Sequence, residues 1–141
     1  MKEDIEQIKL LAIFHYVVAG FAGLFACFPI FHLIMGISML TGDFFPEGTP
    51  PDMPFPLPMF GLMFTLIPAA IILFGWSFAI CLAISGYFLT RHQRWLFCVV
   101  MAGISCMFTP FGTVLGVFTI IVLMRPSVKT LFNYGLPTPQ P

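Results

Sequence analysis

Three long stretches without charged side chains dominate the pattern of hydrophobic and polar positions along the chain. Residues 10–40, 59–90 and 95–124 contain no Asp, Glu, Lys or Arg. A polar, proline-dense connector at 41–58 and a short basic segment at 91–94 separate them. A helix needs about 20 apolar residues to cross the hydrocarbon core of a bilayer, so each stretch predicts at least one transmembrane helix.

A helix breaker lies near the middle of the third stretch. The sequence Thr109-Pro110-Phe111-Gly112 combines a proline with a glycine, and both disfavour a continuous helix. We therefore expect two short helices that form a hairpin, with Gly112 at a positive φ in the turn. The alternative is one tilted helix with a kink at Pro110. The hairpin is favoured because it puts the basic residues at both ends of the stretch on one side of the membrane.

The pattern predicts an all-α, polytopic membrane protein with four transmembrane helices, paired as one long and one short antiparallel hairpin. The whole chain, residues 1–141, is expected to form a single transmembrane domain. The connector 41–58 is expected to be an external proline-rich loop, and residues 135–141 a disordered tail. The predicted helices cover residues 8–40, 59–90, 94–109 and 112–125.

The composition supports a lipid environment. Hydrophobic residues make up 59% of the 141 residues and charged residues only 9%, whereas about 25% of the residues in a typical soluble domain are charged. A short chain has a large surface for its volume, and a surface in water needs more charges than these. The net charge is +0 and the six basic residues are spread along the chain. Nucleic acid is not expected as a partner, because phosphate binding needs clustered Lys and Arg.

The distribution of charge predicts the orientation in the membrane. With four spans, all six basic residues fall on the side of the N-terminus, whereas the 41–58 connector has three acidic residues and no basic one. Lys and Arg collect on the cytoplasmic side, so both termini are predicted to be cytoplasmic. Tyr16, Tyr87 and Trp95 fall near the same interface, as an aromatic belt requires. The residues expected to contact lipid headgroups are Arg91, Arg94, Arg125 and Lys129.

Small residues recur at four-residue spacing in several of the predicted helices. Such residues let helix backbones approach closely, which matters in lipid because no hydrophobic driving force holds helices together there. Packing inside the bundle is the favoured interpretation, and oligomerisation through one of these faces is the alternative. The predicted packing residues are Ala19, Gly23 and Cys27; Gly75, Ala79 and Ala83; and Gly112 and Gly116.

The first two apolar stretches exceed the thickness of a bilayer. A continuous helix over 10–40 would be about 46 Å long at 1.5 Å per residue, against a hydrocarbon core of about 30 Å. The surplus is expected on the acidic, external side, where apolar side chains need cover from a partner. Aromatic residues in the 41–58 connector favour the same function. The predicted partner-binding residues are Phe31, Met35, Phe44, Phe45, Phe55, Phe60, Met63 and Phe64.

His15 and His32 are the side chains of the apolar stretches that can change charge near neutral pH. Their spacing puts them roughly 25 Å apart along one helix, too far to share one metal ion or one haem. Packing and hydrogen bonding are therefore favoured, and binding of a haem or pigment is the alternative. The four cysteines form no C-x-x-C pair and are interpreted as packing residues. No metal site and no cofactor are expected.

Nothing in the sequence indicates catalysis. The predicted spans contain no acidic or basic residue, although ion-coupled transporters normally place one in the membrane. The chain also has no H-E-x-x-H motif, phosphate-binding loop, paired carboxylates or nucleophile with a neighbouring base. We expect no enzyme activity and assign no catalytic residue.

The leading hypothesis for the function is a non-catalytic interaction protein of the membrane. It would be an accessory subunit of a larger membrane complex or a self-assembling homo-oligomer, with membrane lipids and other subunits or copies of itself as partners. The first alternative is a passive channel or carrier formed by several copies. The second is a haem- or pigment-binding membrane protein that uses His15 or His32.

The last apolar stretch also resembles a segment of known proteins. The residues Phe108-Thr109-Pro110-Phe111-Gly112-Thr113-Val114-Leu115-Gly116-Val117-Phe118, followed by Arg125-Pro126-Ser127-Val128, look like the closing hairpin of small four-span bacterial inner-membrane proteins without known activity. Leu11-Ala12-Ile13-Phe14-His15-Tyr16 is similar to their opening helix. The Pro-Phe-Gly-Thr turn is the most specific part. The resemblance implies a bacterial inner-membrane location and a four-span layout, and it implies no activity.

Overall fold

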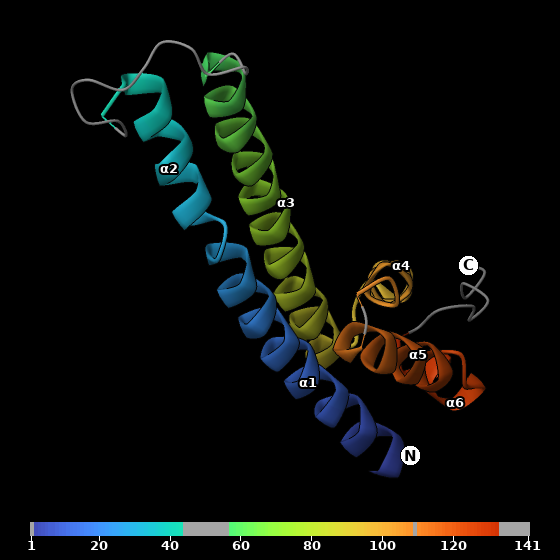
Figure 1. Cartoon of the computed structure of the whole chain (residues 1–141). Coiled ribbons are helices and arrows are strands. Elements are labelled where there is room, and N and C mark those ends of the chain that lie inside the picture. The colour runs from blue at the N-terminus through green and yellow to red at the C-terminus, as the bar shows by residue number, and fades with distance from the viewer. Residues whose placement is uncertain (1, 44–56, 109, 133–141) are drawn as a thin grey trace, which may run out of the picture. The chain divides into compact units, whose positions relative to one another are not determined.

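A computed structural model describes residues 2–43, 57–108 and 110–132, and every regular element within them is a helix. The all-α fold predicted from the sequence is therefore confirmed. Most of the predicted external loop, 44–56, and the predicted tail at 135–141 lie outside the described residues. The helices, labelled in Figure 1, are α1 (Lys2–Cys27), α2 (Ile30–Thr41), α3 (Leu57–Arg91), α4 (Trp95–Ser105), α5 (Phe111–Leu123) and α6 (Pro126–Leu131).

The chain divides into two compact units. The first unit contains residues 1–21 and 78–141, and the second contains residues 22–77. The division passes through α1 and α3, which each contribute to both units. The single domain expected from the sequence therefore consists of two units, each with its own packing.

Two segments, Lys2–Thr41 and Pro58–Arg91, are long and apolar enough to cross a membrane. The helix predicted over 8–40 is not continuous, because α1 ends at Cys27 and α2 begins at Ile30. Pro29 explains the break, since it has no N–H, clashes with the preceding turn and disfavours the helical conformation of the residue before it. By contrast, α3 runs without interruption over 35 residues although Pro68 lies inside it.

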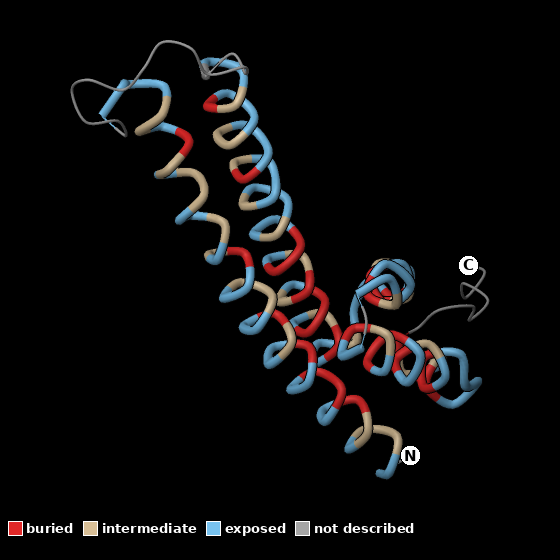
Figure 2. Tube along the Cα trace, in the orientation of Figure 1, coloured by how far each residue is buried: buried red, intermediate tan, exposed pale blue. Residues whose placement is uncertain are grey.

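The first unit has a packed core. Figure 2 shows buried residues along one face of the first half of α1, near the end of α3, and along α5. Leu82, Leu89 and Leu123 have no exposed surface, and neither do Ile8 and Val128. Five helices thus contribute to this core: the first half of α1, the last turns of α3, and α4, α5 and α6. The buried polar residues are His15, Ser85, Ser105 and Thr119.

The helices α4 and α5 form a short antiparallel hairpin. At one end, Nε1 of Trp95 donates a hydrogen bond of 2.9 Å to the carbonyl oxygen of Leu123. At the other end, a Cβ atom on Gly112 would fall on the carbonyl oxygen of Ser105. These contacts exclude the alternative of one kinked helix. The helices have 11 and 13 residues and are shorter than the helices predicted over 94–109 and 112–125.

Backbone turns differ from the expectation at one glycine. Gly112 lies inside α5 and does not have the positive φ expected for it. Among the described residues, positive φ occurs at Gly42 (82°), His92 (54°) and Arg94 (50°). Gly42 ends α2 in the left-handed conformation that glycine adopts without strain. His92 and Arg94 lie between α3 and α4, where the left-handed backbone reverses the chain within a few residues.

In the second unit, α2 packs against the first half of α3 through direct backbone contact. A Cβ atom on Gly36 would lie 2.6 Å from the backbone carbonyl carbon of Phe64, and one on Gly61 would lie 3.0 Å from Cγ of Leu40. Within residues 22–43 and 58–77, the buried residues are Ala26, Gly36, Gly61 and Pro68. All four are small or cyclic, so every large apolar side chain described in this unit is at least partly exposed.

Candidate functional site

A histidine is buried in the core of the first unit. His15 on α1 has no exposed surface, and its Nδ1 lies 2.9 Å from the carbonyl oxygen of Leu11. A carbonyl oxygen only accepts hydrogen bonds, so Nδ1 carries the proton and Nε2 of the neutral ring is an acceptor. Nε2 is buried and has no hydrogen-bond partner among the described residues.

Polar groups of α3 and α4 lie near His15. A Cβ atom on Gly86 would lie 3.2 Å from Cβ of His15. The adjacent residue, Ser85, has no exposed surface, and its Oγ finds no hydrogen-bond partner within the described parts of the chain. Sγ of Cys98 lies 3.8 Å from the carbonyl oxygen of Ser85. The packing thus brings His15, Ser85 and Cys98 to about the same level of the unit.

The helix α5 contributes Thr119. The pairing of Trp95 with Leu123 and of Ser105 with Gly112 sets the register of the α4–α5 hairpin and places Thr119 opposite Cys98. Thr119 is fully buried, and its Oγ1 donates to the carbonyl oxygen of Leu115 at 2.7 Å. We define the polar layer as His15, Ser85, Cys98 and Thr119, one residue from each of α1, α3, α4 and α5.

The two histidines singled out in the sequence belong to different units. His32 is half-buried, with the rings of Phe28, Phe31 and Phe64 at centroid distances of 6.3, 6.0 and 6.3 Å. Among the residues that the structure describes, no group of three His, Cys, Asp or Glu could hold a metal ion. The closed packing around His15 leaves no exposed ring edge for a haem iron, so the cofactor interpretation gains no support from the geometry.

The four-residue pattern of small residues matches the close contacts only in part. A Cβ atom on Gly75 would lie 2.7 Å from Cβ of Ala26, and one on Gly116 would fall on the carbonyl oxygen of Ala102. Gly23, in contrast, has nothing within 4 Å of where its Cβ would be, so it does not make the close contact that the pattern predicts. Of the remaining predicted packing residues, Ala19 and Ala79 are buried, and Cys27 and Ala83 are half-buried.

Sequence reasoning missed two important contacts. Gly36 makes the closest approach between α2 and α3, but His32 and Leu40 stand four positions away, so a search for spaced small residues does not find it. Ser85 was also missed, because an uncharged stretch does not reveal which serine faces inward. Its neighbour Gly86, against which His15 packs, carries the only local signal.

The four basic residues expected at lipid headgroups all have partners inside the protein. The guanidinium groups of Arg91 and Arg94 lie 5.4 and 5.6 Å from the ring centroids of aromatic residues on α3. Nζ of Lys129 lies 5.2 Å from the ring centroid of Trp95. Trp95 is buried and belongs to the core of the first unit. Its place in an interfacial belt stays a prediction. Headgroup contact by the basic residues stays a prediction.

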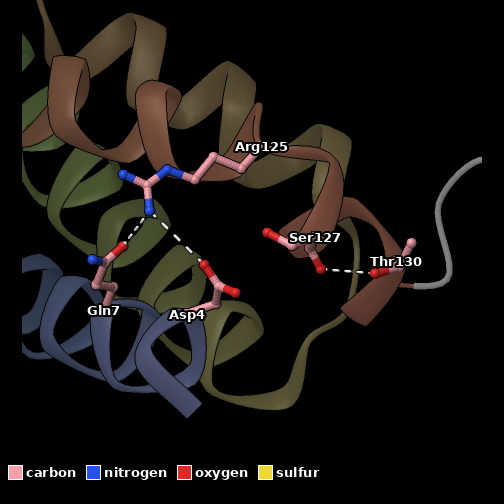
Figure 3. A network of polar contacts seen from close by, with 5 residues as sticks. All are labelled: Asp4, Gln7, Arg125, Ser127 and Thr130. Carbon is pink, nitrogen blue, oxygen red and sulfur yellow. Dashed lines mark hydrogen bonds and ion pairs between the residues drawn. The ribbon is translucent and has the colours of Figure 1, made fainter. Parts of the chain in front are cut away.

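Arg125 connects the junction of α5 and α6 to the start of α1, as Figure 3 shows. Its Nη1 donates a hydrogen bond of 2.9 Å to Oε1 of Gln7 and lies 3.8 Å from Oδ1 of Asp4. Within α6, Oγ1 of Thr130 donates to the carbonyl oxygen of Ser127 at 2.7 Å. Arg125 therefore anchors the first turns of α1 to the other end of the first unit.

Replacing Arg125 with alanine should loosen the start of α1 without unfolding the protein. The Arg125 side chain is 46% exposed, and such surface pairs contribute about 1 kcal/mol or less. Hydrogen exchange measured by mass spectrometry should become faster at residues 2–9 and stay unchanged in α4 and α5. Arg91→Ala is the control, because Arg91 packs on Tyr87 of its own helix. Equal increases in hydrogen exchange at residues 2–9 in both variants would contradict the conclusion that Arg125 anchors the start of α1.

The predicted partner-binding residues that the structure describes all lie in the second unit. Phe31 and Met63 are exposed, and Met35, Phe60 and Phe64 are half-buried. The other three, Phe44, Phe45 and Phe55, lie outside the described residues. We define the apolar hairpin as α2 together with residues 57–77 of α3. It contains no charged residue.

The most exposed apolar side chains of the second unit line the apolar hairpin and the end of α1. Phe31 is 70% exposed, and Leu73 and Phe74 are 70% and 68% exposed. Phe25 and Phe28 are 74% and 75% exposed. A surface of this composition needs cover from lipid or from protein. No family model matches the chain, and neither a curated protein nor a solved structure shows significant similarity to it, so no family is assigned.

Proposed function

We propose that the chain is a non-catalytic integral membrane protein whose apolar hairpin docks onto the helices of another membrane protein, as an accessory subunit of a membrane complex. One observation carries this proposal: the described part of the second unit buries only small or cyclic residues and leaves its Phe, Leu, Ile and Met side chains at least partly exposed. A long apolar helix in a soluble protein would instead be buried on most of its surface.

Helix length explains why lipid alone does not cover α2 and the first turns of α3. The 35 residues of α3 extend over about 52 Å at 1.5 Å per residue, whereas the hydrocarbon core is about 30 Å thick. With Arg91 at the cytoplasmic interface, the first third of α3 lies beyond the core. On α1, Pro29 comes about 20 residues after Lys9, so α2 begins near the external interface. Lipid tails do not reach side chains at that height.

The chemistry of the apolar hairpin defines the partner. Its exposed faces are apolar and uncharged, so the complementary surface is an apolar helix face of another protein at the external side of the membrane. The contacts of Gly36 and Gly61 use one face of each helix and leave the other faces free. Interfaces of this kind are built by van der Waals packing, for which exposed Phe and Met side chains provide large contact areas.

Charges on the apolar hairpin should release the protein from its complex. Met35→Glu combined with Met63→Lys should leave membrane insertion intact and reduce the assembly size on a detergent column, because the partner's apolar face would have to take charged groups out of water. The control is Thr41→Glu with Pro58→Lys, at exposed positions beside the polar connector. An unchanged assembly size in the Met35/Met63 variant would show that lipid alone covers this surface.

The composition of the purified complex separates the alternatives. A co-purifying membrane protein supports the accessory subunit, and copies of this chain alone would indicate self-assembly. A colourless ring that conducts a solute would support the channel or carrier. A Soret band that disappears in a His15 or His32 variant would support the haem or pigment protein.

The topology that we infer is a bacterial inner-membrane protein with both termini in the cytoplasm, as the charge distribution and the resemblance imply. Two helices, α1 and α3, cross the membrane, and the α4–α5 hairpin enters from the cytoplasmic side. With 11 and 13 residues, α4 and α5 are about 16 and 20 Å long, too short to cross a core of about 30 Å. This arrangement keeps four helices in the membrane with two full crossings.

The depth of the hairpin turn supports this topology. The ring of Phe108, next to the turn, stacks on Phe78 of α3 at a centroid distance of 4.2 Å. Phe78 lies about 20 Å along α3 from Arg91, so the turn would stop about two thirds of the way through the core. The turn is suited to lipid, since Met107 and Phe111 are 83% and 75% exposed. Beside the turn, Oγ1 of Thr113 donates a hydrogen bond of 2.8 Å to the carbonyl oxygen of Cys106, which satisfies two polar groups without water.

Labelling of single cysteines tests this topology. In a background without the native cysteines, Glu47→Cys should react with a membrane-impermeant maleimide in intact cells, and Thr130→Cys only after permeabilisation. Met107→Cys should react in neither case, because the turn stays in lipid. Labelling of Met107→Cys in intact cells would instead show that α4 and α5 also cross the membrane, and labelling of Thr130→Cys in intact cells would contradict the orientation.

A further inference from the structure

Three basic side chains gather at one end of the first unit. Arg91 ends α3, and Arg94 directly precedes Trp95, the first residue of α4. Nζ of Lys129 lies 5.2 Å from the ring centroid of Trp95, so α6 packs against the same place. The fold thus brings Lys129 to two arginines that are distant from it in the sequence. We define the basic cluster as Arg91, Arg94 and Lys129.

Within the described residues, no carboxylate pairs with the basic cluster. The acidic side chains of the first unit all lie in the first turns of α1, as Glu3, Asp4 and Glu6. Asp4 pairs with Arg125, which is not a member of the cluster. No acidic residue follows Asp52 in the sequence. The charges of the cluster are therefore available to an anion that the chain itself does not supply.

Aromatic rings position the three cations without using their hydrogen-bond donors. The guanidinium group of Arg91 lies 5.4 Å from the ring centroid of Tyr87, and that of Arg94 lies 5.6 Å from the ring centroid of Phe88. The contact of Lys129 with its indole ring is of the same kind. A cation is attracted to the face of a ring by electrostatics, which needs no N–H···O bond. The N–H groups of Arg and Lys can still donate to phosphate oxygens.

The exposed surface beside the basic cluster is apolar. Leu96 and Val100, on the first turns of α4, are exposed. Ile84, Tyr87 and Arg91 are exposed on α3 and lie on one face of it, since they are three and four positions apart. Along this face an aliphatic side chain is followed by an amphipathic ring and then by a cation. A bilayer has the same order of hydrocarbon, interface and headgroup.

We propose that the basic cluster binds the phosphates of anionic phospholipids and makes the protein select these lipids over zwitterionic ones. The proposal rests on the membrane location proposed above, and it goes beyond general headgroup contact because it predicts a preference. A zwitterionic headgroup carries its own cation beside the phosphate, so it gains less from three further cations. Arg125 is excluded from the site, because Asp4 already offsets its charge. The adjoining apolar side chains fit acyl chains and do not fit a water-soluble anion.

Lipid selectivity of the full chain, reconstituted in phosphatidylcholine bilayers, tests the proposal on the wild-type protein. Electron spin resonance of spin-labelled lipids gives the association constant of phosphatidylglycerol relative to phosphatidylcholine at the protein surface. The constant should favour phosphatidylglycerol several-fold and fall as salt is added. Equal association of the two lipids would overturn the proposal even if no variant folds. A larger decrease in phosphate than in chloride at equal ionic strength would also overturn it, because a free anion would then be the ligand.

Single charge removals locate the site. Arg94→Gln should lower the relative association constant by up to about fivefold, which is the contribution of one basic residue close to an anionic membrane surface. Arg94→Lys should keep most of the preference, because it keeps the charge. The control is Lys2→Gln, which removes the same charge from the exposed, acidic start of α1. Equal decreases in Arg94→Gln and Lys2→Gln would mean that net charge alone attracts the lipid, and would refute the site.

The docking proposal and the lipid proposal fail separately. Met35→Glu combined with Met63→Lys changes the second unit only, so this variant should keep the wild-type preference for phosphatidylglycerol. Loss of that preference in the docking variant would show that the basic cluster is not the source of the selectivity. An unchanged assembly size in the same variant would contradict docking alone.

Discussion

Replacing Gly116 with leucine should prevent α4 and α5 from packing together. A Cβ atom on Gly116 would fall on the carbonyl oxygen of Ala102 and lie 2.5 Å from Sγ of Cys106. That carbonyl accepts the N–H of Cys106 at 3.2 Å at the end of α4, so it cannot move without breaking the helix. Overpacking of a core costs about 1–3 kcal/mol or more. We expect the variant to be expressed at a normal level. Little of it should elute as a single species from a detergent column.

The matched control for this variant is Gly103→Leu. Gly103 lies in the same hairpin, next to Ala102, but its Cβ would meet nothing within 4 Å. A leucine at position 103 should therefore be tolerated. Gly61→Leu should be intermediate, because the nearest atoms belong to the side chain of Leu40, which can move. Equal losses for Gly116→Leu and Gly103→Leu would mean that close packing of α4 on α5 does not hold the first unit together.

The second large effect is expected from Gly36→Leu, which should separate α2 from α3 and leave the first unit folded. A Cβ atom at this position would lie 2.6 Å from the backbone carbonyl carbon of Phe64 and 2.7 Å from the backbone nitrogen of Thr65. Both atoms belong to a helical backbone, so α2 itself must move. The assembly size should fall as for the charged variant, whereas hydrogen exchange in α4 and α5 should stay slow.

Gly23→Leu controls for the added bulk in the same unit. Nothing lies within 4 Å of a Cβ at Gly23, so the assembly size should be unchanged. If Gly36→Leu also keeps its partner, docking does not need α2 and α3 to be paired, and a single helix would be the recognised element. If Gly36→Leu instead unfolds α4 and α5, the two units are not independent.

The large features of the fold were predictable because they depend on local properties of the chain. Uncharged stretches of sufficient length define α1 and α3, and Pro110 marks the turn between α4 and α5. The break between α1 and α2 was not predicted, although Pro29 is visible in the sequence. Membrane helices tolerate proline when neighbouring groups satisfy the backbone, and Pro68 inside α3 is such a case. The sequence does not show which of the two prolines ends a helix.

The candidate sites were less predictable, because they depend on which helices face each other. Four-residue spacing finds Gly75 and Gly116 but also selects Gly23, which has no close neighbour. The spacing identifies a face and cannot say whether another helix lies against it. His15 was recognised as a polar residue in an apolar stretch. Its burial against Gly86 of α3 depends on the packing of other helices around α1.

The two units differ in how they can be assembled during synthesis. Residues 22–77 are contiguous, so the second unit is complete once α3 has left the ribosome. The first unit takes its core from both ends of the chain, and the bond between Gln7 and Arg125 closes a separation of 118 positions. Such distant contacts form late, because the loop between them must be ordered first. The N-terminal turns of α1 can therefore make their contacts with Arg125 only after the last helices have been synthesised.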